Sequence, residues 1–108
     1  MRSWYPIPAS ELDNKRLLGE HAELHCMNSV ILNGRKGYSK HPETLRWKGH
    51  TKAMKRRHDE IEHEMLKRGM KPKSPMQFDT RDNEDSPGLI EPLEVMKTKL
   101  KQKIEKSI

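Results

Sequence analysis

The stretch LLGEHAELHC, from Leu17 to Cys26, decides how the chain folds because it places two glutamates and two histidines within one predicted helix. At about 100° per residue, one side of that helix carries four large apolar residues: Leu17, Leu24, Met27 and Ile31. Glu20 falls inside this apolar side, Glu23 lies at its edge, and His21 lies on the other flank. Burying a carboxylate costs free energy unless it is paired or hydrogen-bonded, so the packing depends on what Glu20 meets.

The pattern leaves two roles open for Glu20. In the structural role, its carboxylate pairs with Arg16 or with a histidine of the same helix. In the functional role, Glu20 and Glu23 belong to a site, because ionisable groups in apolar surroundings often have shifted pKa values and such groups gather at functional sites. The helical pattern alone does not choose between these two roles.

Composition limits the size of the core and the kind of partner. The 108 residues suit one small domain, and 31% hydrophobic against 35% charged residues means that the core is small. Residues 1–76 hold 16 Lys/Arg and 9 Asp/Glu, a net charge of +7, whereas residues 77–108 hold 6 and 7, a net charge of −1. A basic body favours a polyanionic partner such as nucleic acid, although ordinary solubilising charge explains it equally well.

Cysteine usage and hydropathy predict where the protein works. Cys26 is the single cysteine, which excludes an internal disulfide and indicates a reducing compartment. No apolar run approaches the roughly 20 residues that a membrane span needs, and MRSWYPIPASELD lacks the apolar stretch of a signal peptide. We therefore expect a cytoplasmic monomer without a membrane partner.

The periodicity predicts an all-α, compact single domain of about three helices with long loops, followed by a C-terminal tail that can form a short helix. The predicted helices begin with Glu11–Leu32 and continue with a short one from Pro42, then 50–68 and 90–106. Ser10 is the predicted N-cap of the first helix, and Asn33-Gly34 and Gly69 are predicted helix ends. The predicted division is a body at 1–76 and a linker with tail at 77–108.

Two segments outside these helices have distinct compositions. Residues 1–9 contain Pro6 and Pro8 around Ile7, which predicts an extended arm. Residues 70–89 contain three prolines and the run DTRDNEDSPG, which predicts a linker or a segment draped over the body.

The stretch RKGYSKHPETLRWKGHTKAMKRR, residues 35–57, holds nine Lys/Arg and one acid, Glu43. Tyr38 and Trp47 are interleaved with these charges. Basic side chains neutralise phosphates and aromatic rings stack on bases, so this stretch is a candidate DNA-binding surface. The alternative is a solvated helix face with Trp47 in the core.

Metal binding is a weaker possibility. His21 and His25 are four residues apart and can share a metal ion, but HAELH lacks the glutamate that follows the first histidine in zincins. No second cluster has ligand spacing along the chain, and Cys26 has no cysteine partner. We therefore predict no metal site and interpret His50, His58 and His63 as packing or surface residues.

Three segments together resemble the pyrimidine-dimer DNA glycosylase family, the phage-type endonuclease V or UV endonuclease. They are SELDNKRLLGEHAEL (Ser10–Leu24), HPETLRWKGH (His41–His50) and MKRRHDEIEHEMLKRG (Met54–Gly69). Their order and spacing carry the similarity, which covers roughly residues 1–76. The resemblance implies a bacterial or phage-encoded DNA repair enzyme that needs no cofactor and acts on double-stranded DNA with a lesion.

The resemblance also implies a mechanism. The α-amine of Met1, or of Arg2 after processing, attacks the sugar C1′ of a flipped nucleotide, and the resulting Schiff base undergoes β-elimination. Glu23 matches the family's key carboxylate, with Glu20 and His21 as supporting residues. Expected DNA contacts combine this resemblance with the basic stretch: Arg16, Arg35, Lys36, Lys40, Arg46, Trp47, Lys48 and His50.

Departures from the family pattern keep an alternative open. Arg2 stands where well-known members have a small residue, and two family arginines of the first helix correspond to Ala22 and Cys26. The alternative is a non-catalytic, basic DNA-binding module of the same fold. A small basic protein that binds RNA or a protein partner is a third hypothesis.

Overall fold

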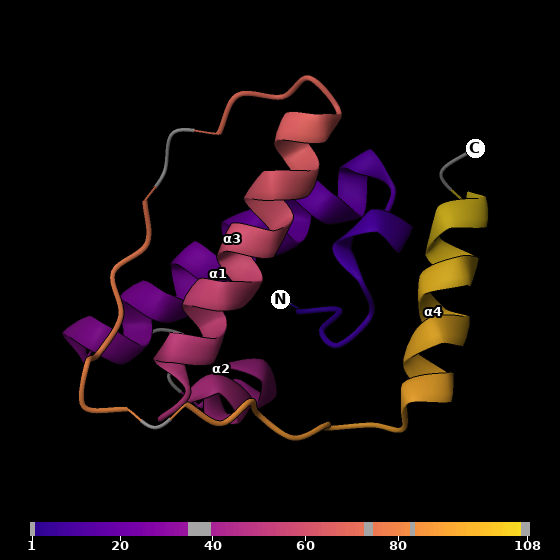
Figure 1. Ribbon diagram of the computed structural model, residues 1–108. Coiled ribbons are helices and arrows are strands. Elements are labelled where there is room, and N and C mark those ends of the chain that lie inside the picture. The colour runs from indigo at the N-terminus through magenta and orange to yellow at the C-terminus, as the bar shows by residue number, and fades with distance from the viewer. Residues whose placement is uncertain (1, 35–39, 73–74, 83, 107–108) are drawn as a thin grey trace.

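The computed structural model describes residues 2–34, 40–72, 75–82 and 84–106. All regular structure in these ranges is helical, which confirms the all-α prediction (Figure 1). The elements are the short 3-10 helix η1 (Ala9–Glu11) and four α-helices: α1 (Asn14–Asn33), α2 (Pro42–Trp47), α3 (Thr51–Lys67) and α4 (Leu93–Lys106). Among the described helices, none is both long and apolar enough to cross a membrane.

The start of the first long helix differs from the prediction. Asp13 is its N-cap and its side chain accepts a hydrogen bond from the Arg16 backbone N–H at 3.1 Å. Ser10 lies within η1 instead, so the predicted N-cap is wrong. The physical reason is Leu12, which adopts an extended backbone and buries its side chain, and thereby separates η1 from α1.

The predicted helix ends are confirmed. Gly34 takes up the left-handed conformation after α1, with φ of 63°. Gly69 has φ of 82° after α3, where the Gly69 and Met70 amides donate to the carbonyls of Leu66 and Met65. This pair of hydrogen bonds is a Schellman motif, which satisfies carbonyls left free at a helix end. Pro42 begins α2, as predicted.

The core lies between α1, α3 and the N-terminal segment. The predicted faces are confirmed, because Leu17, Leu24 and Met27 of α1 and Met54, Ile61 and Met65 of α3 are all buried. The sequence predicts an extended arm over residues 1–9, whereas the N-terminal segment packs into the core: Trp4 and Ile7 are only 4% and 1% exposed. Large apolar residues are few in this chain, and these two add to the core that the helices form.

The C-terminal helix packs on the N-terminal segment. The described part of residues 70–92 contains no helix. It is fixed to the body by Met76, which is buried, and by the Gln77 carbonyl, which accepts a hydrogen bond from the Asn28 side chain at 2.8 Å. This draped segment leads to α4, whose Met96 and Leu100 join the same core cluster as Trp4 and Ile7. Figure 1 shows the N-terminal segment between the α1–α3 pair and α4.

We expect Gly69→Ala to lower the free energy of unfolding by about 1 kcal/mol, because a side chain disfavours the left-handed backbone at this helix end. Urea denaturation followed by circular dichroism measures the change. Gly19→Ala is the matched control: Gly19 lies inside α1 and a Cβ there meets no atom within 4 Å. In the control, the free energy of unfolding is expected to rise by about 0.5–1 kcal/mol, because alanine is favoured over glycine inside a helix. Equal changes in the two variants would contradict this role of Gly69.

Candidate active site

A buried ion pair joins α1 to α3. Glu20 and Arg57 are 1% and 2% exposed, and the guanidinium donates from Nε to Oε2 at 2.6 Å and from Nη2 to Oε1 at 3.1 Å. Desolvation by itself lowers the pKa of Arg57, but the hydrogen bond and charge of Glu20 outweigh it, so the pKa is raised. The structural role is thus present, although the partner is on α3 rather than the Arg16 or histidine that the sequence suggested.

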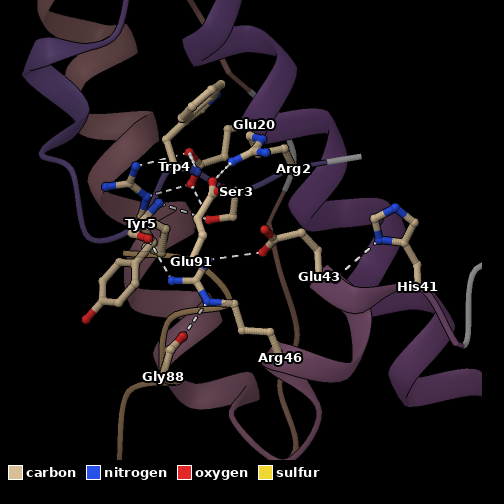
Figure 2. A network of polar contacts seen from close by, with 11 residues as sticks. Arg2, Ser3, Trp4, Tyr5, Glu20, His41, Glu43, Arg46, Gly88 and Glu91 are labelled. Atoms are coloured by element: carbon tan, nitrogen blue, oxygen red, sulfur yellow. Dashed lines mark hydrogen bonds and ion pairs between the residues drawn. The ribbon is translucent and has the colours of Figure 1, made fainter. Parts of the chain in front are cut away.

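The same carboxylate holds the N-terminal segment. The Ser3 hydroxyl donates to Oε2 at 3.0 Å and the Trp4 backbone N–H donates to Oε1 at 2.7 Å (Figure 2). Arg57 also donates to the Ile7 carbonyl at 2.8 Å. Each oxygen of Glu20 therefore accepts two hydrogen bonds, which compensates the desolvation of a buried charge.

A cavity of about 380 Å³ opens beside this pair. Its lining contains Glu20, Glu23 and Trp4 and four basic residues: Arg2, Lys15, Arg16 and Lys103. Glu23 is partly exposed, and among the described residues no hydrogen bond or ion pair reaches its carboxylate. An accessible carboxylate surrounded by cations is an arrangement that can stabilise a developing positive charge while the rim attracts phosphates.

Arg2 is held at the mouth of this cavity. Its guanidinium lies over the Trp4 ring, 4.8 Å from the centroid, and forms an ion pair with Glu91. Lys99 approaches the other oxygen of Glu91 at 2.6 Å, and hydrogen bonds from Lys99 and then Arg2 lower the pKa of that carboxyl. Glu91 precedes α4 and Lys99 belongs to it, so the C-terminal part of the chain holds Arg2, which lines the cavity.

Sequence reasoning missed several residues that build this cavity. Lys15 lies on the same helical face as Gly19 and Glu23, so the spacing i, i+4, i+8 is a signal that identifies it. Lys103 has no such signal, because α4 reaches the cavity only through tertiary packing: its carbonyl accepts from Arg16 at 3.0 Å. The buried role of Arg57 has no sequence signal either, because Arg57 belongs to a run of basic residues that looks like a solvated surface.

Two residues expected to contact DNA lie in the interior instead. Arg46 donates to Glu43 at 3.1 Å and, at 2.6 Å each, to the carbonyls of Tyr5 and Gly88 (Figure 2). Trp47 is 0% exposed. The expectation of DNA contact is corrected for both, because Arg46 satisfies distant backbone groups and Trp47 fills the core. The core alternative for Trp47 is the one the structure shows.

Three further expected site residues lie away from the cavity lining. Lys40 and Lys48 are exposed, and His50 is partly exposed with its Nδ1 2.9 Å from the Asp85 carbonyl oxygen. Met1, Arg35 and Lys36 lie outside the described residues. The structure therefore brings Glu20, Glu23, Arg2 and Arg16 together at the cavity, whereas Lys40, Lys48 and His50 are outside its lining.

His21 faces α3 and does not line the cavity. Its Nε2 lies 3.0 Å from the Glu62 Oε2, and its ring stacks on that of His58 with 5.0 Å between centroids. His25 Nε2 lies 3.0 Å from His58 Nε2. These four residues form a histidine–glutamate cluster, and His21, His25 and His58 each offer a ligand atom within 4.8 Å of the others. The spacing of histidines along one helix does not reveal this cluster, because its residues come from two helices, α1 and α3.

We expect Arg57→Ala to lower the free energy of unfolding by about 3–5 kcal/mol, because it leaves the Glu20 charge buried without its partner. Urea denaturation measures this loss, and faster hydrogen exchange of the Trp4 amide should accompany it. Arg81→Ala, which breaks a solvent-exposed pair with Asp79, is the control and should show no measurable change. Equal stability of the two variants would contradict a central role of the buried pair.

The comparisons with known proteins agree with the sequence resemblance. A family model described as pyrimidine dimer DNA glycosylase matches residues 1–78, which include η1 and α1 to α3 but not α4. No curated protein and no solved structure gives a significant match. The matched region spans more than half of the 108 residues and supports a DNA substrate and a glycosylase function of this kind. The chain therefore belongs to the pyrimidine dimer DNA glycosylase family.

Proposed function

We propose that this protein is a bifunctional DNA glycosylase and abasic-site lyase, with Glu23 as its catalytic carboxylate. The observation that carries the proposal is the placement of Glu23 in a cavity with a basic rim, beside an N-terminal segment that Glu20 holds in place. Family membership supports the glycosylase class. The lyase reaction and the roles of individual residues are part of the proposal.

The proposed nucleophile is the α-amine of Met1, or of Arg2 where Met1 is removed. An α-amine has a reference pKa of about 7.7–8.0, so part of it is unprotonated and nucleophilic at neutral pH. Two observations support delivery of this amine to Glu23: the Arg2 side chain lines the same cavity, and the Ser3 hydroxyl and Trp4 amide both bind Glu20.

The reaction proceeds in two stages. The amine nitrogen bonds to C1′ as the bond from C1′ to the base breaks, and the base leaves with the bonding pair and takes up a proton. The nitrogen then loses a proton to Glu23, and its restored lone pair expels O4′, which is protonated as an iminium forms. Loss of a C2′ proton drives β-elimination, in which the C3′–O3′ bond breaks and the phosphate leaves. Glu23 stabilises the cationic sugar and carries these protons.

The basic rim is proposed to bind the phosphates around the flipped nucleotide. Arg2, Lys15, Arg16 and Lys103 surround the cavity and place positive charge from three separate parts of the chain. Flipping costs a few kcal/mol, and least at a damaged pair, so the rim needs only to capture a nucleotide that the lesion has already loosened. This arrangement favours lesions over intact duplex.

We expect Glu23→Gln to reduce turnover on a duplex with one pyrimidine dimer by about 100-fold or more while affinity is kept, since the amide cannot accept the transferred protons. Strand cleavage and a binding titration measure the two effects. Glu11→Gln, an exposed glutamate outside the cavity lining, is the control and should cleave normally. Normal cleavage by the Glu23 variant would refute its catalytic role.

Borohydride trapping identifies the nucleophile. We expect a trapped adduct with the dimer duplex and with an abasic-site duplex. Digestion of the adduct is expected to map it to the α-amine and tells whether Met1 or Arg2 carries that amine. An adduct on the abasic duplex alone would leave a lyase that acts on another base. No adduct on either would favour the non-catalytic DNA-binding module.

Lys15→Ala is expected to weaken binding to all duplexes to a similar extent and to reduce the slope of log K against log salt by about 1, because one phosphate contact is lost. Fluorescence anisotropy over a series of salt concentrations measures both. Lys67→Ala, at the exposed end of α3, is the control and should leave the slope unchanged. A slope unaffected by Lys15→Ala would remove this lysine from the DNA-binding rim.

A further inference from the structure

We propose that His21, His25, His58 and Glu62 form a binding site for one divalent transition-metal ion, best suited to Zn²⁺, that joins α1 to α3. The ligands come as two pairs, each four residues apart: His21 and His25 on α1, and His58 and Glu62 on α3. Residues four apart share one helix face, so two packed helices bring these side chains together. The ligand atoms of His21, His25 and His58 lie within 4.8 Å of one another, and Glu62 Oε2 contacts two of these histidines. This proposal departs from the sequence analysis, which predicted no metal site from the spacing of residues along the chain.

Three of the six separations between the four ligand atoms are close to those of tetrahedral coordination. Zinc bonds to imidazole nitrogen and carboxylate oxygen are about 2.0–2.2 Å, so adjacent ligand atoms in a tetrahedron are roughly 3.3–3.5 Å apart. Here His25 Nε2 lies 3.0 Å from His58 Nε2, His58 Nε2 lies 3.3 Å from Glu62 Oε2, and His21 Nε2 lies 3.0 Å from the same oxygen. An expansion of a few tenths of an ångström between side chains accommodates the ion.

A hydrogen bond outside the cluster orients one ligand for the metal. His58 Nδ1 lies 3.1 Å from Asp59 Oδ1, and because an ionised carboxylate only accepts, Nδ1 carries the proton. In the neutral ring, Nε2 is then left with its lone pair toward the cluster. A carboxylate that fixes the tautomer of a ligating histidine is a common arrangement around zinc.

A divalent cation would also suit the cluster electrostatically when His58 is neutral. In the neutral form of His58 with its proton on Nδ1, Nε2 is an acceptor that faces another acceptor, Glu62 Oε2, at 3.3 Å. His58 is 1% exposed at its side chain, so water screens this repulsion poorly. A bound divalent ion converts the opposed lone pairs into bonds. Three imidazoles and one carboxylate are the ligand types that Zn²⁺ prefers, whereas Mg²⁺ and Ca²⁺ favour all-oxygen sites.

The expected role is structural. His21 follows Glu20 on α1 and His58 follows Arg57 on α3, so the ion would tie the two helices beside the buried pair that holds the N-terminal segment. None of the four ligands lines the cavity with Glu23. The side chains of His21 and Glu62 are 14% and 21% exposed, which gives the ion a route from solvent.

The test uses the full chain, stripped with a chelator and then titrated with Zn²⁺ alone, without DNA. We expect one equivalent to bind by calorimetry and Tm to rise by on the order of 10 °C when free Zn²⁺ is 100 times Kd. His25→Ala and Glu62→Gln, both at partly exposed positions, should lose most of this rise. His63→Ala, an exposed histidine of the same helix, is the matched control and should keep it.

Substitution by Co²⁺ in the unaltered protein gives a measurement that does not depend on any variant folding. The intense visible absorption of tetrahedral cobalt with nitrogen and oxygen ligands would support the site, and a weak octahedral spectrum would overturn it. Failure to bind Zn²⁺, or an equal Tm rise in the His25, Glu62 and His63 variants, would also overturn it. Because no DNA is present, these outcomes are independent of the proposed glycosylase activity.

Discussion

The buried ion pair between Glu20 and Arg57 is the constraint on which the rest of the structure depends. A carboxylate and a guanidinium that have both left water are stable only when their polar atoms are satisfied, and here Ser3, Trp4 and Ile7 supply or accept the remaining hydrogen bonds. The pair therefore does more than join α1 to α3. It holds the first residues of the chain against both helices.

This constraint separates the roles of two glutamates that lie one turn apart. Glu20 accepts four hydrogen bonds and is committed to structure, whereas Glu23 remains partly exposed in the cavity. A rigid neighbour is what a catalytic group needs, because its geometry is then set before the substrate arrives. Glu20 is thus assigned a structural role and Glu23 the proposed catalytic role, which explains why one helix carries both carboxylates.

The C-terminal helix adds Lys103 to a cavity that is otherwise lined by the matched family region. The match ends at residue 78, yet Lys103 lines the cavity and Glu91 pairs with Arg2. Met96 and Leu100 fill the core beside Trp4 and Ile7, so α4 is attached through apolar contact as well as charge. Arg2, a departure from the family pattern, is thereby accommodated by residues near the other end of the chain.

The sequence by itself determined the helices and their buried faces, because helix periodicity, proline at a helix start and glycine at a helix end are local properties. It also placed Glu20 and Glu23 near each other and predicted the family. Only the tertiary structure decided that Glu20 meets Arg57, that Arg46 and Trp47 are interior, and that Lys103 reaches the cavity. The same holds for His58 and Glu62 beside His21. Each of these facts is a contact between segments distant in sequence, and charge counts or spacing along one helix carry no information about which helices pack together.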